Sequence, residues 1–224
     1  MKKIKYSEIT PEKIYQHRRS FIKSIGLSAG SVALTSISFI NHARSNEENK
    51  LTSFKDITTY NNYYEFGTSK SDPYINSQQF KTTPWTISIE GEVEKPIKLS
   101  MDEITETFVS EERIYRLRCV EGWSMVIPWM GFSLSELLSK VNPTSKAKFV
   151  EFESVYDPDQ MKGQRYPVLN WPYKEGLRID EAMHPLTTVV TGLYGKKLPN
   201  QNGAPLRIFT PWKYGFKSAK AIVK

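Results

Sequence analysis

The sequence predicts an α+β domain in which short strands and short helices alternate along the chain. Residues 85–93 alternate apolar with polar side chains, as expected for a strand with one buried face. Residues 114–120 and 148–156 show the same alternation. Thirteen prolines fall mostly in the connections between these segments. This pattern favours a mixed fold with long loops, and such loops often carry functional residues.

Two capping-box patterns predict helices between the strands. Residues 100–103 read Ser-Met-Asp-Glu and predict a short helix that ends near Phe108. Residues 133–136 read Ser-Leu-Ser-Glu and predict a second helix that runs toward Val141 and stops before Pro143.

The first 43 residues have the features of an export signal. Residues 1–23 carry seven Lys or Arg against two Glu, and residues 24–43 contain no charged side chain. Residues 18–23 read Arg-Arg-Ser-Phe-Ile-Lys, which is similar to a twin-arginine signal. We therefore expect the twin-arginine translocation machinery to deliver the protein to the periplasm. An ordinary secretory signal and a membrane anchor are the alternatives, but serine and glycine dilute the apolar span.

The basic charge of the chain belongs mostly to this signal. Without residues 1–43 the net charge falls from +7 to +2, because seven positive and two negative side chains are removed. No strong case for a nucleic-acid partner remains. We expect residues 44–59 to form a flexible leader and residues 60–224 to form one domain.

Cys119 is the only cysteine in the chain, and only three histidines accompany it. A zinc site of cysteine and histidine needs more such ligands than the chain offers. Three interpretations of Cys119 remain: an inert buried thiol, a catalytic thiolate paired with His184, or one protein ligand to a metal held mainly by a cofactor. Arg116 and Arg118 would favour the thiolate form, which is the form that binds metal. If the strand stays extended, Glu121 lies on the same side as Cys119.

Three separated segments resemble one protein family. They are residues 60–67, residues 116–125 with Pro128 and Trp129, and residues 201–207 running into residues 211–217. Together they are similar to the catalytic subunits of periplasmic molybdopterin-dependent protein-methionine-sulfoxide reductases, which have the sulfite-oxidase-like molybdopterin-binding fold. The resemblance covers the chain from about Tyr60 to its last residue and agrees with an export route for proteins that fold around a cofactor.

The resemblance implies a molybdenum-molybdopterin cofactor and assigns residues to it. Cys119 is expected to supply its sulfur to molybdenum, and Glu121 is the candidate for proton handling, with a surface ion pair to Arg118 as its alternative. The residues expected to contact the pterin are Asn61, Tyr64, Glu65, Ser154 and Asn202. The residues expected to hold the phosphate end of the cofactor are Arg207, Ser218, Ala219 and Lys220.

The implied function is removal of oxygen from methionine sulfoxide in oxidised exported proteins. Because the chain has no haem attachment motif, the resemblance implies that a haem-binding membrane subunit delivers the electrons. Relatives continue beyond the last strand, so we expect a C-terminal β-rich part of the family fold to be missing here. The alternatives are a cofactor-free exported binding module and a thiol hydrolase that uses Cys119 with His184.

Overall fold

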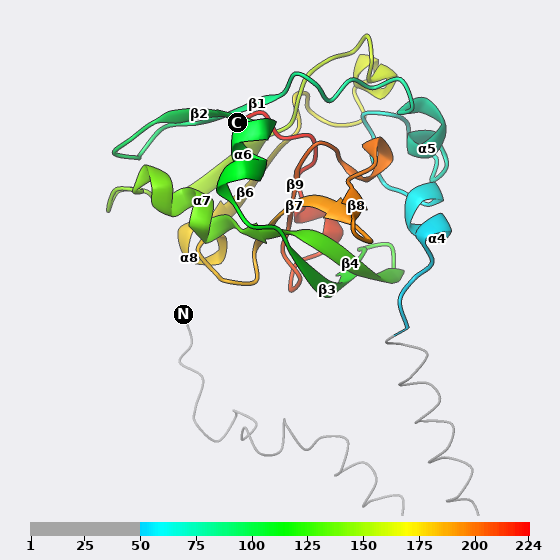
Figure 1. Ribbon diagram of the computed structural model, residues 1–224. Coiled ribbons are helices and arrows are strands. Elements are labelled where there is room, and N and C mark those ends of the chain that lie inside the picture. The colour runs from blue at the N-terminus through cyan, green and yellow to red at the C-terminus, as the bar shows by residue number, and fades with distance from the viewer. Residues whose placement is uncertain (1–49) are drawn as a thin grey trace, which may run out of the picture. The chain divides into compact units, whose positions relative to one another are not determined.

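An antiparallel hairpin of β3 (Glu111–Arg118) and β4 (Ser124–Ser133) dominates the structure, a computed structural model that describes residues 50–224 (Figure 1). β7 (Thr188–Leu193) pairs with the other edge of β4, and β8 (Lys196–Lys197) and β9 (Arg207–Phe209) each pair with β7. All of these pairings are antiparallel. The resulting five-stranded sheet presents the β3–β4 turn at one end.

Two smaller hairpins lie apart from this sheet, and the end of the chain joins them. β1 (Thr86–Ile89) pairs with β2 (Ile97–Ser100), and β5 (Phe149–Glu153) pairs with β6 (Lys174–Arg178). Residues 221–224 run between β1 and β5. The amide of Ser88 donates to the carbonyl of Val223 at 2.9 Å, and the amide of Glu153 donates to the carbonyl of Lys224 at 2.8 Å.

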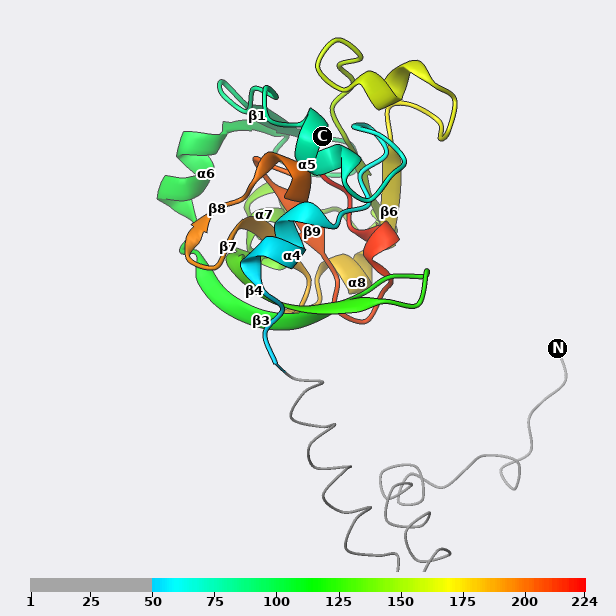
Figure 2. The same ribbon diagram turned by 90° about the vertical axis from the view of Figure 1, so that its right-hand side faces the viewer.

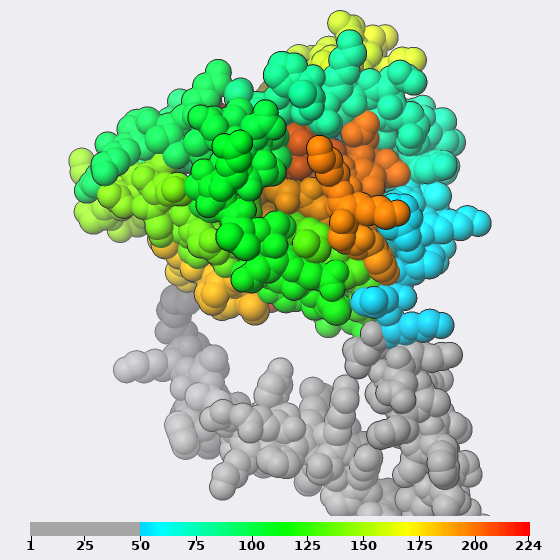
Figure 3. Space-filling model, in the orientation of Figure 1, coloured from blue at the N-terminus to red at the C-terminus, as the bar shows by residue number. Residues whose placement is uncertain are grey.

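Short helices fill the connections. Figure 2 shows α4 in front of the five-stranded sheet, and Figure 3 shows the same residues, in cyan, lying against those of β8, in orange. No helix within residues 50–224 is long and apolar enough to cross a membrane. The α-helices are α4 (Phe54–Thr59), α5 (Asp72–Asn76), α6 (Met101–Thr107), α7 (Leu134–Val141) and α8 (Ile179–Ala182), and the 3₁₀ turns are η2 (Lys162–Arg165), η3 (Asn200–Asn202) and η4 (Gly215–Lys217).

The structure confirms the elements with clear local signals. Both capping boxes are present: the Ser100 hydroxyl accepts from the amide of Glu103 at the start of α6, and Ser133 begins α7. The three predicted strands are found as β1, β3 and β5, each shorter or shifted at its ends. The predicted strand over residues 85–93 stops at Ile89, because the chain then turns back into β2.

The flexible leader expected for residues 44–59 is wrong over its described part. Residues 54–59 form α4, whose Ile57 side chain is 1% exposed. The amide of Thr52 donates to the carbonyl of Val126 at 3.0 Å, which ties the segment to β4. Lys196 lies over the ring of Phe54 at 5.2 Å. This segment is therefore part of the folded domain. The predicted export signal, residues 1–43, lies outside the described residues.

The two faces of the main sheet contribute to two apolar clusters. On one face, alternate residues of β4 (Met125, Ile127 and Trp129) pack with Phe209 and others. On the other face, Phe132 and its neighbours pack under α6 and α7. The first cluster forms the floor of the cavity described below, so the same strand supplies both core and site.

Phe132→Ala should destabilise the domain strongly. Phe132 is 2% exposed and stacks on Phe108 with ring centroids 4.3 Å apart. Loss of such a side chain costs about 3–5 kcal/mol, because apolar contacts are lost and a cavity remains. Urea unfolding of the purified chain measures the change. The matched control is Val109→Ala, 80% exposed and next to Phe108, which should stay within about 0.5 kcal/mol of wild type. Equal midpoints for the two variants would contradict the assigned packing.

Candidate cofactor site

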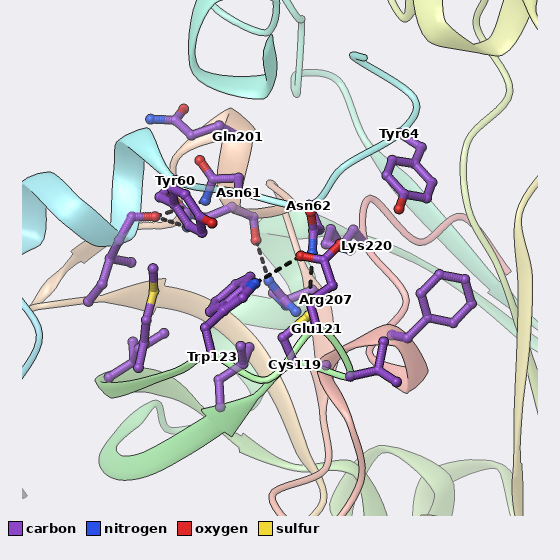
Figure 4. Close-up of a pocket in the computed structure, with 18 of the residues that line it drawn as sticks. Tyr60, Asn61, Asn62, Tyr64, Cys119, Glu121, Trp123, Gln201, Arg207 and Lys220 are labelled. Atoms are coloured by element: carbon purple, nitrogen blue, oxygen red, sulfur yellow. Dashed lines mark hydrogen bonds between the residues drawn. The ribbon is translucent and has the colours of Figure 1, made fainter. Parts of the chain in front are cut away.

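A cavity of about 160 Å³ lies against the end of the main sheet, between β3, α4 and the C-terminal segment (Figure 4). Its lining combines one thiol, several amides and two cations with an apolar floor. Eight of the predicted site residues line it: Asn61, Tyr64, Glu65, Cys119, Glu121, Asn202, Arg207 and Lys220.

Cys119 stands at the first position after β3, in the turn that leads to β4. The amide of Cys119 donates to the carbonyl of Trp123 at 2.9 Å, and the amide of Gly122 donates to the carbonyl of Cys119 at 3.1 Å. Gly122 has φ = 87°, which a glycine adopts without strain. The expectation that the strand stays extended to Glu121 is therefore wrong. The turn nevertheless leaves Glu121 on the lining of the same cavity as Cys119.

A hydrogen-bonded network surrounds the sulfur. The Asn62 amide donates to Sγ of Cys119 at 3.4 Å, and Lys70 donates to Oδ1 of Asn62 at 2.5 Å. Lys70 also donates to Glu121 at 2.8 Å, and the Trp123 indole donates to the other oxygen of Glu121 at 2.9 Å. Figure 4 shows Asn62, Glu121 and Trp123 directed toward one another beside Cys119. Glu121 therefore pairs with Lys70, not with Arg118 as the alternative supposed.

These contacts determine the charge of the Lys70–Glu121 pair. Hydrogen bonds from Lys70 and then from Trp123 lower the pKa of Glu121 to about 2. Desolvation acts against the charged form of Lys70, but its hydrogen bond to Glu121 outweighs this, so the pKa of Lys70 is raised. Both groups are ionised near neutral pH. That state disfavours the predicted proton handling by Glu121, because a carboxylate with so low a pKa has no proton to donate.

Two cations, Arg207 and Lys220, also line the cavity and form no ion pair with a carboxylate in the described part of the chain. Arg207, in β9, is 4% exposed, and a backbone bridge places Lys220 beside it. None of the ion pairs within residues 50–224 includes either side chain. Arg207 donates through Nη1 to the carbonyl of Asn202 at 2.9 Å, and its buried Nε has no partner. Buried unpaired cations favour the binding of an anion.

Aromatic rings partly replace that missing anion. The Arg207 guanidinium lies 5.2 Å from the centroid of Trp129, and the Lys220 ammonium lies 5.1 Å from that of Tyr63. Burial still lowers the pKa of Arg207 to about 10. Burial and the nearby Arg207 lower the pKa of Lys220 to about 8, against the opposing effects of Glu65 and Cys119.

Two amides between the sulfur and the cations have unpaired oxygens. The side-chain NH₂ groups of Asn61 and Asn202 both donate to the carbonyl of Ile57, at 2.8 and 3.0 Å. Their Oδ1 atoms are buried without a partner. The end of α4 therefore orients both amides so that an acceptor of each remains available, which suits the polar edge of a ring that carries N–H donors.

Three predicted residues do not line this cavity: Ser154, Ser218 and Ala219. All three are buried, and the hydroxyls of Ser154 and Ser218 have no hydrogen-bond partner in the protein. The candidate partner in the hydrolase hypothesis, His184, is also absent from the lining and packs against Trp212 with centroids 4.5 Å apart. Within residues 50–224, the structure therefore brings no histidine to Cys119 in the cavity.

Sequence reasoning missed several lining residues. Asn62 and Gln201 lie inside the motifs that carry the resemblance, so their amides were detectable there. Phe216 likewise lies in the motif of residues 211–217, whereas Tyr173 reaches the cavity from a segment that no motif marks. The Lys70 contact is also set by tertiary structure, because Lys70 and Glu121 are 51 residues apart.

The comparisons with known proteins agree with this donor set. Residues 74–224 match the family model described as the oxidoreductase molybdopterin binding domain. A protein named protein-methionine-sulfoxide reductase catalytic subunit MsrP, from Xanthomonas axonopodis pv. citri, is 54% identical over 233 residues, covering 97% of this chain and 72% of that protein. The protein of the same name from Burkholderia mallei is 51% identical over 235 residues, covering 97% of this chain and 71% of its own length.

A solved structure shows the same fold at low identity. The sulfane dehydrogenase SoxCD from Paracoccus pantotrophus aligns with a TM-score of 0.53 and 15% identity, over 69% of this chain and 40% of that one. The mixed helix and sheet arrangement is therefore that of a sulfite-oxidase-like molybdopterin-binding domain. From its family model and its relatives, the chain belongs to the molybdopterin-binding oxidoreductases, in the family of protein-methionine-sulfoxide reductase catalytic subunits.

Proposed function

We propose that this protein reduces methionine sulfoxide in oxidised proteins of the periplasm and binds its molybdenum-molybdopterin cofactor in the Cys119 cavity. One observation carries the assignment of the site. A single cavity is lined by the only cysteine of the chain and by Arg207 and Lys220, two cations that form no ion pair in the described residues.

The lining residues fit the cofactor by the chemistry of their atoms. Cys119 offers a soft sulfur ligand to molybdenum. The unpaired oxygens of Asn61 and Asn202 suit the N–H groups of a pterin, and Arg207 with Lys220 suits its phosphate. When bound, the cofactor supplies the two-electron chemistry by which a sulfoxide loses its oxygen.

The network around Cys119 has a positioning role in this proposal. Asn62 donates to the sulfur, and Lys70 holds Asn62 and Glu121 together. Donors to a ligand atom fix its orientation and adjust its electron density. The Lys70–Glu121 ion pair thereby joins the segment that carries Asn62 to the turn that carries Cys119.

The partners are proposed from the names of the relatives and from the sequence. A protein called a catalytic subunit works with another subunit, and we assign the electron delivery to a haem-binding membrane subunit. The same name indicates methionine sulfoxide in proteins as substrate. The motif at residues 18–23 supports twin-arginine export, which transports proteins after the cofactor has been inserted.

Cys119→Ser should abolish sulfoxide reduction while the pterin stays bound. The substitution removes the sulfur ligand but leaves Arg207 and Lys220 in place. Turnover with an artificial electron donor, beside molybdenum and pterin content, measures both effects. Glu112→Gln, an exposed change on the same strand, is the control and should keep turnover and loading. Full activity of Cys119→Ser would contradict the proposal. So would wild-type protein that contains no molybdenum after purification from a host that makes the cofactor.

Arg207→Met and Lys220→Met should each lower cofactor occupancy. A charge-assisted hydrogen bond contributes about 1.5–3 kcal/mol. Its loss therefore weakens binding about tenfold or more. Lys213→Met is the matched control, because Lys213 is paired with Glu181 at 2.7 Å and does not line the cavity. The measurement is molybdenum per chain after purification. Wild-type occupancy in both cavity variants would mean that these cations do not hold the phosphate.

Export should fail when Arg18→Lys and Arg19→Lys are combined. The net charge is unchanged, but the planar guanidinium groups are lost. We expect folded, cofactor-loaded protein to accumulate in the cytoplasm, as cell fractionation with molybdenum analysis would measure. The control exchanges Lys2 and Lys3 for arginine and should be exported normally. Normal periplasmic delivery of the double arginine variant would indicate an ordinary secretory signal instead.

A further inference from the structure

One wall of the cavity is formed by an exposed turn. Residues 214–217 form a turn that includes η4, and η4 contains no buried residue. Within this turn Phe216 is 49% exposed, yet it lines the cavity. The chain then becomes deeply buried at once, with Ser218 at 1% and Ala219 at 0% exposure. Residues 214–217 are thus a loosely packed turn that precedes Lys220 in the chain.

Two side chains beside β6 hold this wall in place. The hydroxyl of Tyr173 lies 3.0 Å from the carbonyl oxygen of Phe216 and 3.0 Å from Oε2 of Glu175. The other oxygen of Glu175 accepts from the ammonium of Lys217. The Tyr173 and Phe216 rings also meet edge to face, with centroids 5.7 Å apart. Backbone, ring and ion pair therefore all fasten the same turn to β6.

The opposite side of the turn rests on β3, directly before Cys119. Tyr214 forms a backbone bridge with Arg118. Gly215 lies beside Leu117, and a Cβ added to this glycine would be in ordinary van der Waals contact, at 3.4 Å, with the Leu117 side chain. The turn is therefore held between the strand that presents Cys119 and the strand that presents Glu175. A change at Glu175 acts on the cavity wall without touching Cys119, Arg207 or Lys220.

We propose that Tyr173 and Glu175 are positioning residues for the cofactor, because they clamp the turn of residues 214–217 over the cavity and keep Lys220 directed at the cofactor phosphate. The proposal deepens the proposed function and rests on it, since it assumes that Lys220 holds the phosphate. Nothing in the sequence motifs marks Tyr173 or Glu175, so the assignment comes from the tertiary contacts alone.

The elements around the cavity differ in how they are held. β9 and β3 are fixed by ladder pairing in the main sheet, whereas the turn of residues 214–217 depends on the contacts of Tyr173 and Glu175 and on one backbone bridge to Arg118.

Weakening the clamp should make the loaded protein lose its cofactor faster. We expect Glu175→Gln, Lys217→Met and Tyr173→Phe each to shorten the half-life of bound molybdopterin about tenfold, the factor that about 1.4 kcal/mol produces. Because Glu175 and Lys217 act as a pair, the double variant Glu175→Gln with Lys217→Met should lose cofactor no faster than either single variant. The exchanged pair, Glu175→Lys with Lys217→Glu, should recover part of the retention.

Two measurements separate positioning from general stability. Pterin and molybdenum released from the purified holoprotein are followed over time, and hydrogen exchange of residues 214–220 is followed in the cofactor-free protein. The control is Glu151→Gln on the adjacent β5, which removes an exposed contact to Lys174 and should leave both unchanged. Faster release with faster exchange confined to residues 214–220, at an unchanged urea midpoint, would support the clamp.

The outcomes that overturn the clamp differ from those that overturn the proposed function. Wild-type release and wild-type exchange in all three single variants would exclude the clamp. A general fall in the urea midpoint with exchange raised across the whole domain would make Tyr173 and Glu175 ordinary structural residues. A wild-type chain that binds no molybdopterin would refute the proposed function. The role of Tyr173 and Glu175 in cofactor binding would then be refuted as well, even if hydrogen exchange shows that their contacts hold the turn.

Discussion

The constraint on which the site depends is a pair of neighbouring cations, buried Arg207 and half-buried Lys220, that form no ion pair within residues 50–224. Arg207 comes from a strand of the main sheet, and Lys220 is bridged to it by backbone pairing. Gly203, at φ = 102°, makes this approach possible, because a Cβ there would lie 2.9 Å from the Lys220 side chain. Two aromatic faces offset part of the charge, but burial still lowers both pKa values. Cations held in this way favour the binding of an anionic group. They also explain why the cavity combines an apolar floor with strongly polar walls.

The surroundings of the Cys119 sulfur depend on a different kind of interaction, a partly exposed ion pair. The Lys70–Glu121 pair is partly exposed, with 27% and 35% of the side chains accessible, and such pairs contribute little stability. Its value is geometric, because it connects the segment of residues 61–70 to the β3–β4 turn and thereby aims Asn62 at Cys119. The same logic applies to α4, in which the carbonyl of Ile57 orients two buried amides. Each end of the cavity is therefore positioned by contacts between segments that are remote in sequence.

Local patterns predicted those parts of the fold that local energetics decide. Both capping boxes formed, because a serine and a glutamate three residues apart satisfy each other's backbone groups regardless of the surroundings. β3 alternates because one face is exposed. β4 was missed, since residues 125–129 are all buried and therefore show no alternation. β7 and β9 are not predicted for the same reason. Residues 54–59 are predicted as leader because their polar composition conceals a helix with one buried face.

By itself the sequence determined the family, the cofactor class and the placing of Cys119 at the end of a strand, because these depend on short motifs whose residues are neighbours in the chain. It could not decide that the turn after Cys119 bends, that Glu121 is held ionised by Lys70, or that Ser154 and Ser218 lie outside the cavity lining. Those properties depend on desolvation and on partners far away in sequence. Only the tertiary structure brings β6 against the turn of residues 214–217, and only there does Glu175 acquire its contact with Lys217. The charge state and the position of a side chain depend on the groups around it, and those groups come together only when the chain folds.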